Sequence, residues 1–147
     1  MRRSLRTLAG ATLLEVMLVL SIVALIILMS VRYYQSTTTA SQTEQVMGII
    51  SALTAAADNL SLGTAGGYSN VTASNMTSVV GTSNMISPWS GNITFGSGTT
   101  TSYTVNIPKP TAAVCTAVII KLKTNSKFTN VSCTGGGTLS YTYNSTC

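Results

Sequence analysis

The chain has 147 residues, the size of one domain with an appended segment, and only 7% of its residues are charged. Ordinary soluble domains carry roughly 25% charged residues, so this surface is unusually neutral and suits packing against copies of itself. The sequence has no His and three acidic residues, from which no catalytic triad, carboxylate pair or metal-ligand cluster can be assembled. Composition therefore argues against a hydrolytic or metal-dependent enzyme, and we expect no catalytic residue, metal or cofactor.

The net charge of +5 does not indicate a polyanionic partner. Three of the eight basic residues precede residue 7, which leaves five basic and three acidic residues in the rest of the chain. The only basic cluster consists of Lys121, Lys123 and Lys127 and is typical of a solvated face. Its few positive charges would release few counterions from a phosphate backbone. We predict no nucleic-acid partner.

An apolar run lies near the N-terminus. Ala11 to Val31 comprises 21 residues without Gly or Pro and with a single charge, Glu15. As a helix this run would be roughly 30 Å long, the thickness of a bilayer core. The arginines before it favour a cytoplasmic N-terminus, and Arg32 with the two tyrosines after it suits the opposite interface.

Two ordinary interpretations of this run leave Glu15 unexplained. A secretory signal would have a shorter apolar core and a small-x-small cleavage site, which the sequence SVRYYQS does not offer. A plain signal anchor fits the length and the flanking charges. The signal-anchor interpretation gives no role to Glu15, although inserting an acidic residue into a membrane costs about 3 kcal/mol at the centre of a helix and less near its end.

The stretch GATLLEV, Gly10 to Val16, resembles the processing site of type IV prepilins. In that family a short basic leader ends in Gly, a membrane-embedded prepilin peptidase cuts after it and N-methylates the new first residue, and the fifth mature residue is Glu. The resemblance implies cleavage between Gly10 and Ala11, methylation of Ala11 and an assembly role for Glu15. The letters TLLEV are most similar to the type IVb branch, which includes the toxin-coregulated and bundle-forming pilins. The chain departs from the pattern in its small first residue, Ala11, and in a leader of only 10 residues.

The resemblance also implies a segment order and a set of partners. Residues 1–10 would be the leader that is removed, and residues 11–34 would span the inner membrane and later line the filament core. Residues 35–62 would form the amphipathic half of the spine helix, and residues 63–147 the globular head. The expected partners are copies of itself in a helical homopolymer, the prepilin peptidase, the inner-membrane pilus assembly machinery, and the membrane before assembly. The precursor would lie in the bacterial inner membrane, and the assembled filament would be extracellular.

Glu15 acquires a physical role in such a filament. Cleavage after Gly10 removes the positive charges of the leader and creates a free α-amine on Ala11. The apolar helices would bundle in a low-dielectric interior, where an unpaired carboxylate or ammonium is costly. We therefore expect Glu15 of one subunit to neutralise the α-amine of its neighbour and to specify the axial stagger between them.

The helix should continue beyond Arg32 through a polar stretch of weak helix propensity, Gln35 to Gln45. From residue 46 apolar side chains return at three- and four-residue steps, which predicts a face that packs on the head until the run stops at Gly63. This stripe comprises Val46, Ile49, Ile50, Leu53, Ala57 and Leu60.

Local patterns predict the elements of the head. Residues 63–91 are rich in Gly, Ser, Thr and Asn, and we expect one short helix at Thr72–Val80 among surface turns. A turn at Ser87–Gly91 carries Trp89, which is more typical of a core anchor than of a ligand-stacking ring. A hairpin precedes Pro108, Thr111 is a candidate N-cap for a second helix, and two further strands flank a Gly-rich turn. The strands are expected at residues 92–96, 102–107, 127–133 and 138–144. This order indicates an α+β fold, with an antiparallel sheet of about four strands on a long helical spine.

The three cysteines allow three pairings, and sequence alone does not choose among them. In type IVb pilins a Cys near the start of the helix after the first hairpin is bridged to one near the C-terminus. Matched by position, the resemblance implies a Cys115–Cys147 disulfide, with Cys133–Cys147 as the alternative.

Two other functions share parts of the same pattern. One is a pseudopilin of a type II secretion system, which uses the same leader and spine. Major pseudopilins generally bind calcium through acidic loop residues, and this head has no acidic residue after Asp58. The other is an uncleaved, membrane-anchored periplasmic binding or scaffold protein.

Overall fold

The computed structural model describes residues 12–146, and the chain divides into two compact units between Thr37 and Thr38. The helix α1 (Leu13–Gly63) contributes its first part to one unit and its second part to the other. The predicted helix end at Gly63 is confirmed. The predicted cleavage and methylation site, Gly10 and Ala11, lies outside the described residues.

In the first unit the described residues form the apolar part of α1. Residues 12–37 are all exposed, and within the described chain one helix is long and apolar enough to cross a membrane. Two hydroxyl groups in this part bond back to carbonyl groups of the same helix: Ser21 Oγ donates to Met17 O and Ser30 Oγ to Ile26 O, both at 2.8 Å. Because a bilayer core offers polar groups no partner, such internal pairing is compatible with a membrane helix.

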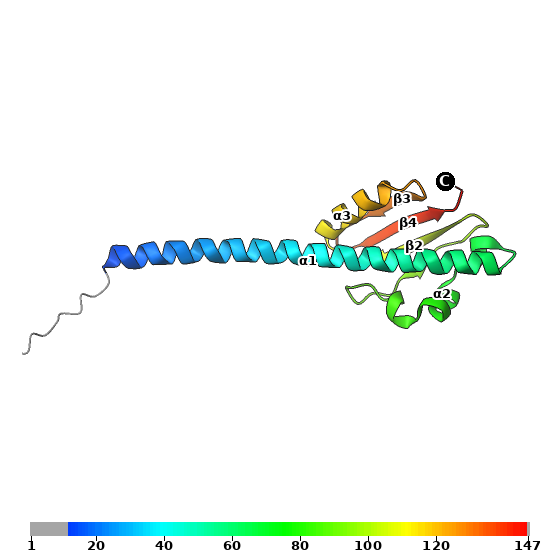
Figure 1. Ribbon diagram of the computed structural model, residues 1–147, viewed down its shortest axis with the longest axis horizontal. Coiled ribbons are helices and arrows are strands. Elements are labelled where there is room, and N and C mark those ends of the chain that lie inside the picture. The colour runs from blue at the N-terminus through cyan, green and yellow to red at the C-terminus, as the bar shows by residue number, and fades with distance from the viewer. Residues whose placement is uncertain (1–11, 147) are drawn as a thin grey trace, which may run out of the picture. The chain divides into compact units, whose positions relative to one another are not determined.

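The second unit combines the rest of α1 with a four-stranded antiparallel sheet in the order β1-β2-β4-β3 (Figure 1). The predicted α+β fold, the short helix, the second helix and the four strands are confirmed. The elements after α1 are the 3-10 helices η1 (Gly67–Asn70) and η2 (Thr82–Met85), the α-helices α2 (Ala73–Val80) and α3 (Ala112–Lys123), and the strands β1 (Thr94–Phe95), β2 (Ser102–Pro108), β3 (Phe128–Cys133) and β4 (Thr138–Asn144).

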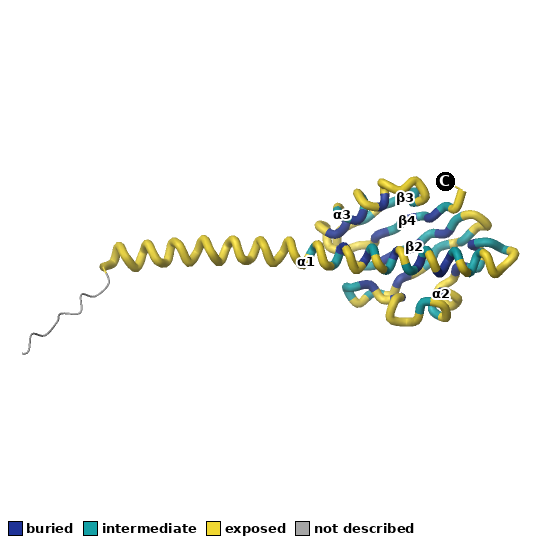
Figure 2. Tube along the Cα trace, in the orientation of Figure 1, coloured by how far each residue is buried: buried dark blue, intermediate teal, exposed yellow. Residues whose placement is uncertain are grey.

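One face of the sheet carries the core of this unit. Alternate residues of the central strands β2 and β4 are buried, whereas the Ser, Thr and Asn residues between them are partly exposed. The second part of α1 covers the buried face with its predicted apolar stripe, in which Ile49 and Leu60 form the partly buried margin (Figure 2). The buried residues that meet there are Val46, Ile50, Leu53 and Ala57 from α1, Tyr103, Val105 and Ile107 from β2, and Leu139, Tyr141 and Tyr143 from β4.

Threonine caps fix where the two shorter α-helices begin. Thr111, the predicted N-cap of α3, accepts a hydrogen bond from Val114 N at 3.4 Å, and Thr72 accepts one from Asn75 N of α2 at the same distance. Each cap satisfies a backbone N–H that has no partner inside the helix. Trp89 packs against the core as predicted, with a buried Nε1 that has no hydrogen-bond partner among the described residues.

The disulfide joins Cys115 to Cys133, with Cα atoms 5.5 Å apart. Both predicted pairings, Cys115–Cys147 and Cys133–Cys147, were therefore wrong, and Cys147 lies outside the described residues. Cys133 is the cross-strand partner of Leu139, whose side chain is buried. Directly opposed residues project from the same face of a sheet, so Cys133 projects from the buried face, to which the disulfide ties α3.

Chain path gives the physical reason for this pairing. The turn after β3 returns to the start of α3, because Gly136 N donates to Pro110 O at 2.7 Å. Cys133 ends β3 just before that turn, and Cys115 lies in the first turns of α3. The other end of β4 lies beside Lys127, which follows α3, because Asn144 N donates to Lys127 O at 2.8 Å. The 12 residues of α3 separate its two ends by roughly 18 Å. Cys133 therefore lies beside the end of α3 that carries Cys115, whereas Asn144 at the end of β4 lies beside the opposite end.

Candidate assembly site on α1

Glu15 lies in the exposed first turn of α1. Thr12 precedes the helix and caps it, because Thr12 Oγ1 accepts a hydrogen bond from Glu15 N at 3.3 Å and Thr12 O accepts one from Val16 N at 3.1 Å. Thr followed three residues later by Glu is the spacing of a capping box, in which the Glu side chain can bond back to the N-cap N–H. The Thr-x-x-Glu spacing is the sequence signal of this cap, which the apolar run around it obscured.

The position of Glu15 gives its carboxylate two possible stabilising partners. One lies inside the subunit, because the positive end of the helix dipole favours an acidic residue in the first turn. The other would lie in a neighbouring subunit, where a newly exposed α-amine would carry a full positive charge. The capping role requires only Glu or Gln, whereas the charge-pairing role requires Glu, so the two roles can be separated by substitution.

The first part of α1, which carries Glu15, is mostly apolar, and its described residues are exposed. Leu13 is 77% exposed and Met29 is 70% exposed, and no described residue from 12 to 38 is buried. A helix that is hydrophobic all round belongs in a membrane or in the interior of a larger assembly. Burying one such Leu or Ile side chain fully contributes roughly 1.5–3 kcal/mol, so a run of this length strongly favours a covered state.

Polar and aromatic residues follow the apolar run. Arg32 comes directly after Val31, and the residues Tyr33 and Tyr34 are 77% and 73% exposed. Arg and Tyr are side chains that suit the membrane–water interface, where a polar tip can reach water and an apolar body can stay in the headgroup layer. Their position therefore agrees with an apolar segment that ends near residue 31.

Asp58, on the second part of α1, is hydrogen-bonded within the second unit. Tyr68 Oη donates a hydrogen bond to Asp58 Oδ1 at 2.6 Å. The Tyr68 ring also contacts the rings of Tyr103 and Tyr143, with centroids 5.3 and 5.9 Å apart. Burial, and after it the hydrogen bond to Asp58, raise the pKa of Tyr68 to about 12. Burial likewise raises the pKa of Tyr103.

We expect the free energy of unfolding to fall as the pH rises from about 10 to about 12. An unfolded tyrosine ionises near pH 10, whereas folded Tyr68 resists ionisation until about pH 12, so its contribution is complete below pH 10 and is lost above it. Tyr68→Phe should reduce this alkaline loss and lower stability at pH 7 by about 1–2 kcal/mol, because Asp58 loses its hydrogen bond. Urea unfolding of the full chain in detergent, followed by near-ultraviolet circular dichroism, measures both effects. The exposed Tyr33, replaced by Phe, is the matched control and should change neither. Unaltered stability of Tyr68→Phe at pH 7 would show that the hydrogen bond contributes nothing.

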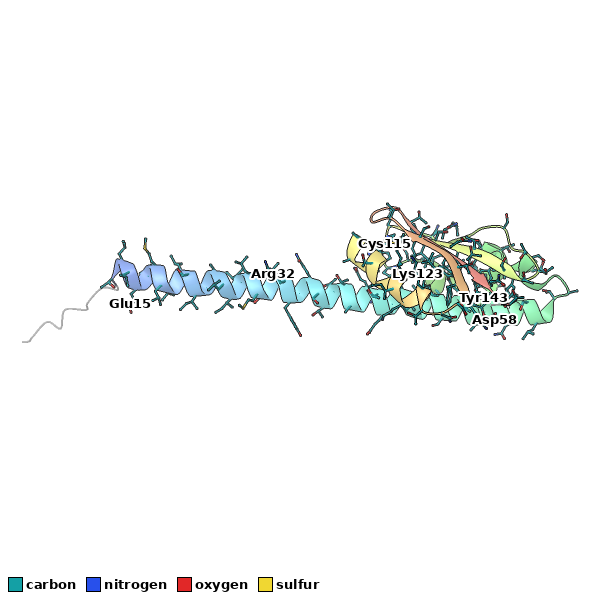
Figure 3. All side chains as sticks on the ribbon, turned by 90° about the horizontal axis from the view of Figure 1, so that it is seen from above. Glu15, Arg32, Asp58, Cys115, Lys123 and Tyr143 are labelled. Atoms are coloured by element: carbon teal, nitrogen blue, oxygen red, sulfur yellow. A yellow bond between two sulfur atoms is a disulfide. The ribbon has the colours of Figure 1, made fainter. Side chains whose placement is uncertain are left out.

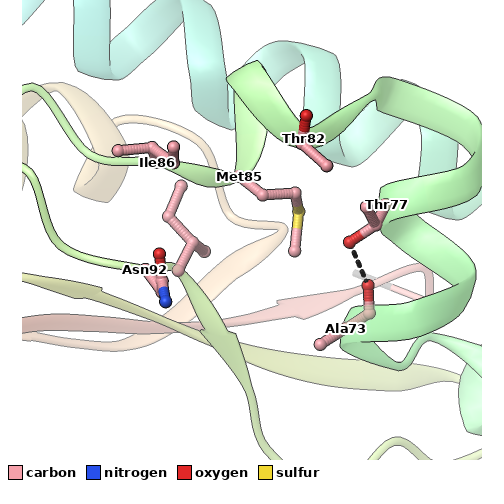
Figure 4. Close-up of a pocket in the computed structure, with 7 residues that line it drawn as sticks. Ala73, Thr77, Thr82, Met85, Ile86 and Asn92 are labelled. Atoms are coloured by element: carbon pink, nitrogen blue, oxygen red, sulfur yellow. Dashed lines mark hydrogen bonds between the residues drawn. The ribbon is translucent and has the colours of Figure 1, made fainter.

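A small pocket lies between α2, η2 and the start of the sheet (Figure 4). Its volume is about 280 Å³. No lining side chain is charged, and Thr77 Oγ1 already donates to Ala73 O at 2.6 Å inside α2. The lining residues are Ala73, Thr77, Thr82, Met85, Ile86, Asn92 and Ile93. Such a lining offers no base that could activate a threonine hydroxyl, and the described chain has no group of three or more His, Cys, Asp or Glu residues that could hold a metal ion.

Comparison of the chain with protein-family models, with curated proteins and with solved structures finds no match.

Proposed function

We propose that the protein is a structural subunit of a bacterial type IV pilus, similar to the type IVb branch. A prepilin peptidase would remove residues 1–10 and methylate Ala11. The mature chain would then be extracted from the inner membrane and polymerised into a thin extracellular filament that serves adhesion, aggregation, motility or mating contact.

One observation carries this proposal: Glu15 stands in the first turn of an uncovered apolar helix, five residues after Gly10. A membrane anchor alone does not need an acidic residue there. A helix that first lies in lipid and later lies among copies of itself does, because its new N-terminus brings a positive charge into the bundle. The α+β head, with its sheet packed on the second part of α1, supports the proposal by supplying the folded unit that such a subunit would display.

The chemistry of assembly follows from burial and charge. In the membrane, Glu15 lies close enough to the helix end to reach the headgroups. In the filament, the α-amine of Ala11 and the Glu15 carboxylate of an adjacent subunit would leave water together. Removing one partner of a buried pair costs about 3–5 kcal/mol, because the other charge stays buried and unpaired. The pair therefore favours the one register in which both charges are satisfied.

Mass spectrometry of the intact protein, isolated from cells with an active prepilin peptidase, tests the proposal. We expect a mass that lacks residues 1–10 and carries one methyl group on Ala11. Gly10→Val is the matched control, because a side chain at the cleavage position should leave the full-length mass. A wild-type chain that keeps its first 10 residues in such cells would instead support an uncleaved, membrane-anchored scaffold protein.

A further inference from the structure

The charges of α1 are few, and two of the four have no assigned partner. After Glu15 the helix carries only Arg32, Glu44 and Asp58, and Asp58 accepts the hydrogen bond from Tyr68 within the head. Arg32 and Glu44 are both exposed (Figure 3 labels Arg32). On a helix surface a residue meets its neighbours three and four positions away. None of these neighbours is charged for Arg32, whose neighbours are Leu28, Met29, Gln35 and Ser36, or for Glu44, whose neighbours are Ala40, Ser41, Met47 and Gly48.

Arg32 would need an acidic partner once copies of the chain assemble. It directly follows the apolar run, so packing that run against other helices would bring the guanidinium next to them and out of water. A desolvated guanidinium is stabilised best by a carboxylate, with which it can form two parallel hydrogen bonds. The chain has three acidic residues. Glu15 is assigned to the α-amine and Asp58 to Tyr68, which leaves Glu44.

Glu44 stands on a surface that a second helix can approach closely. It lies on the face of α1 that the head leaves open, away from the buried Val46 and Ile50. The same face continues at helical spacing through three small exposed residues, Gly48, Ser51 and Ala55. A Cβ built at Gly48 would meet no described atom within 4 Å. Packing within the head therefore does not require a glycine at this position, although glycine weakens a helix interior.

From these observations we infer a contact between copies, which rests on the filament proposed above. The open face of α1 in the head, formed by Glu44, Gly48, Ser51 and Ala55, receives the end of the apolar segment of a second copy. In this contact the guanidinium of Arg32 from one copy pairs with the carboxylate of Glu44 from the other. The small residues let the two helix backbones approach, and the ion pair fixes their register.

A charge swap in the full-length chain tests the pair. Arg32→Glu and Glu44→Arg should each reduce filament yield by about tenfold or more, because like charges would then face each other. Levels of processed subunit in the membrane should stay unchanged, since an arginine on the outer side of the membrane is not needed for orientation. The double variant, Arg32→Glu with Glu44→Arg, should restore the yield to within a few-fold of wild type. Two normal single variants, or a double variant no better than the weaker single variant, would overturn the inference.

A matched control asks whether Glu44 pairs instead with a lysine of α3. Lys123 is exposed in the last turn of that helix. Lys123→Glu combined with Glu44→Arg should not restore filaments, and restoration by this combination would overturn the assignment of Arg32. Disulfide trapping gives a second measurement: Arg32→Cys with Glu44→Cys should produce cross-linked oligomers on non-reducing gels, and each single cysteine should not. Failure of the charge swap alongside normal wild-type filaments rejects only this contact, whereas wild-type chains that form no filaments reject the proposed function as well.

Discussion

Replacing Glu15 with Gln should reduce filament yield by about 100-fold or more while the processed subunit accumulates in the membrane. Gln keeps the length and the capping capacity of the side chain, because either Glu or Gln completes a capping box with Thr12. Only the negative charge is lost. An α-amine buried without its partner costs about 3–5 kcal/mol, and each 1.4 kcal/mol changes the equilibrium constant for adding a subunit by about tenfold. The yield is measured by shearing filaments from cells and quantifying the subunit against the membrane pool.

Two companion variants separate the charge from the cap. Glu15→Ala removes both roles and should match Glu15→Gln in filament loss. Thr12→Ala removes the hydroxyl that accepts from Glu15 N and keeps the charge, so it should cost about 1 kcal/mol of helix stability and leave most of the filaments intact. If Glu15→Gln formed normal filaments and Thr12→Ala did not, Glu15 would serve the helix N-terminus, and the charge-pairing mechanism would be wrong.

The elements of the fold were predictable because each has a local signal. The end of α1 at Gly63, the caps Thr72 and Thr111, and the alternation along β2 and β4 all act within a few residues of the chain. The apolar stripe from Val46 onward was equally local, because helical spacing alone defines which side must be covered. These signals agree with one another, as is typical of a sequence that specifies one fold.

Features that depend on how distant segments meet were not predictable from the same signals. The pairing of β2 with β4, which places β4 inside the sheet and β3 at its edge, brings together residues that lie far apart in the sequence. The position of Cys133 beside the start of α3 follows from that strand order and from the β3–β4 turn, so the disulfide could not be deduced from spacing. The pairing with Cys147 was wrong because it matched the cysteines to those of type IVb pilins by their order along the chain. That match takes no account of the order of the strands in the sheet.

Glu15 shows a different limit. Its place in the chain identified it as a candidate assembly residue, and the structure adds the Thr12 cap that the composition of the run had obscured. Under the proposed mechanism, the partner that would distinguish the two roles belongs to another subunit. When the counter-charge of a residue belongs to another copy, the sequence of one chain shows only a charged residue in an unfavourable place, as it does for Glu15. Arg32 and Glu44 are similar, because they are opposite charges on one helix and neither has a charged neighbour three or four positions away.

Loss of the Cys115–Cys133 disulfide should lower the unfolding free energy of the head by about 3 kcal/mol. The bridge spans 18 residues, and closing a loop of that length restricts the unfolded chain by about this amount. Cys115→Ala with Cys133→Ala tests it, because Ala introduces no polar group into the buried position of Cys115. Urea unfolding of the full chain in detergent, followed by the fluorescence of Trp89, reports on the head because this is the only Trp of the chain. Reduction of the wild-type protein should produce a similar shift without changing any side-chain volume.

Cys147→Ala is the matched control and should leave both the stability and the bridge unchanged. Peptide mapping checks the pairing directly. Trypsin cuts after Lys121, Lys123 and Lys127, and chymotrypsin cuts after Tyr141 and Tyr143, so a double digest places the three cysteines on three different peptides. The peptides of Cys115 and Cys133 should stay together only through the disulfide and separate on reduction. A linked peptide that contains Cys147 would contradict the strand-order argument. It would mean that the end of β4 and the start of α3 meet in a way that the pairing of Asn144 with Lys127 does not allow.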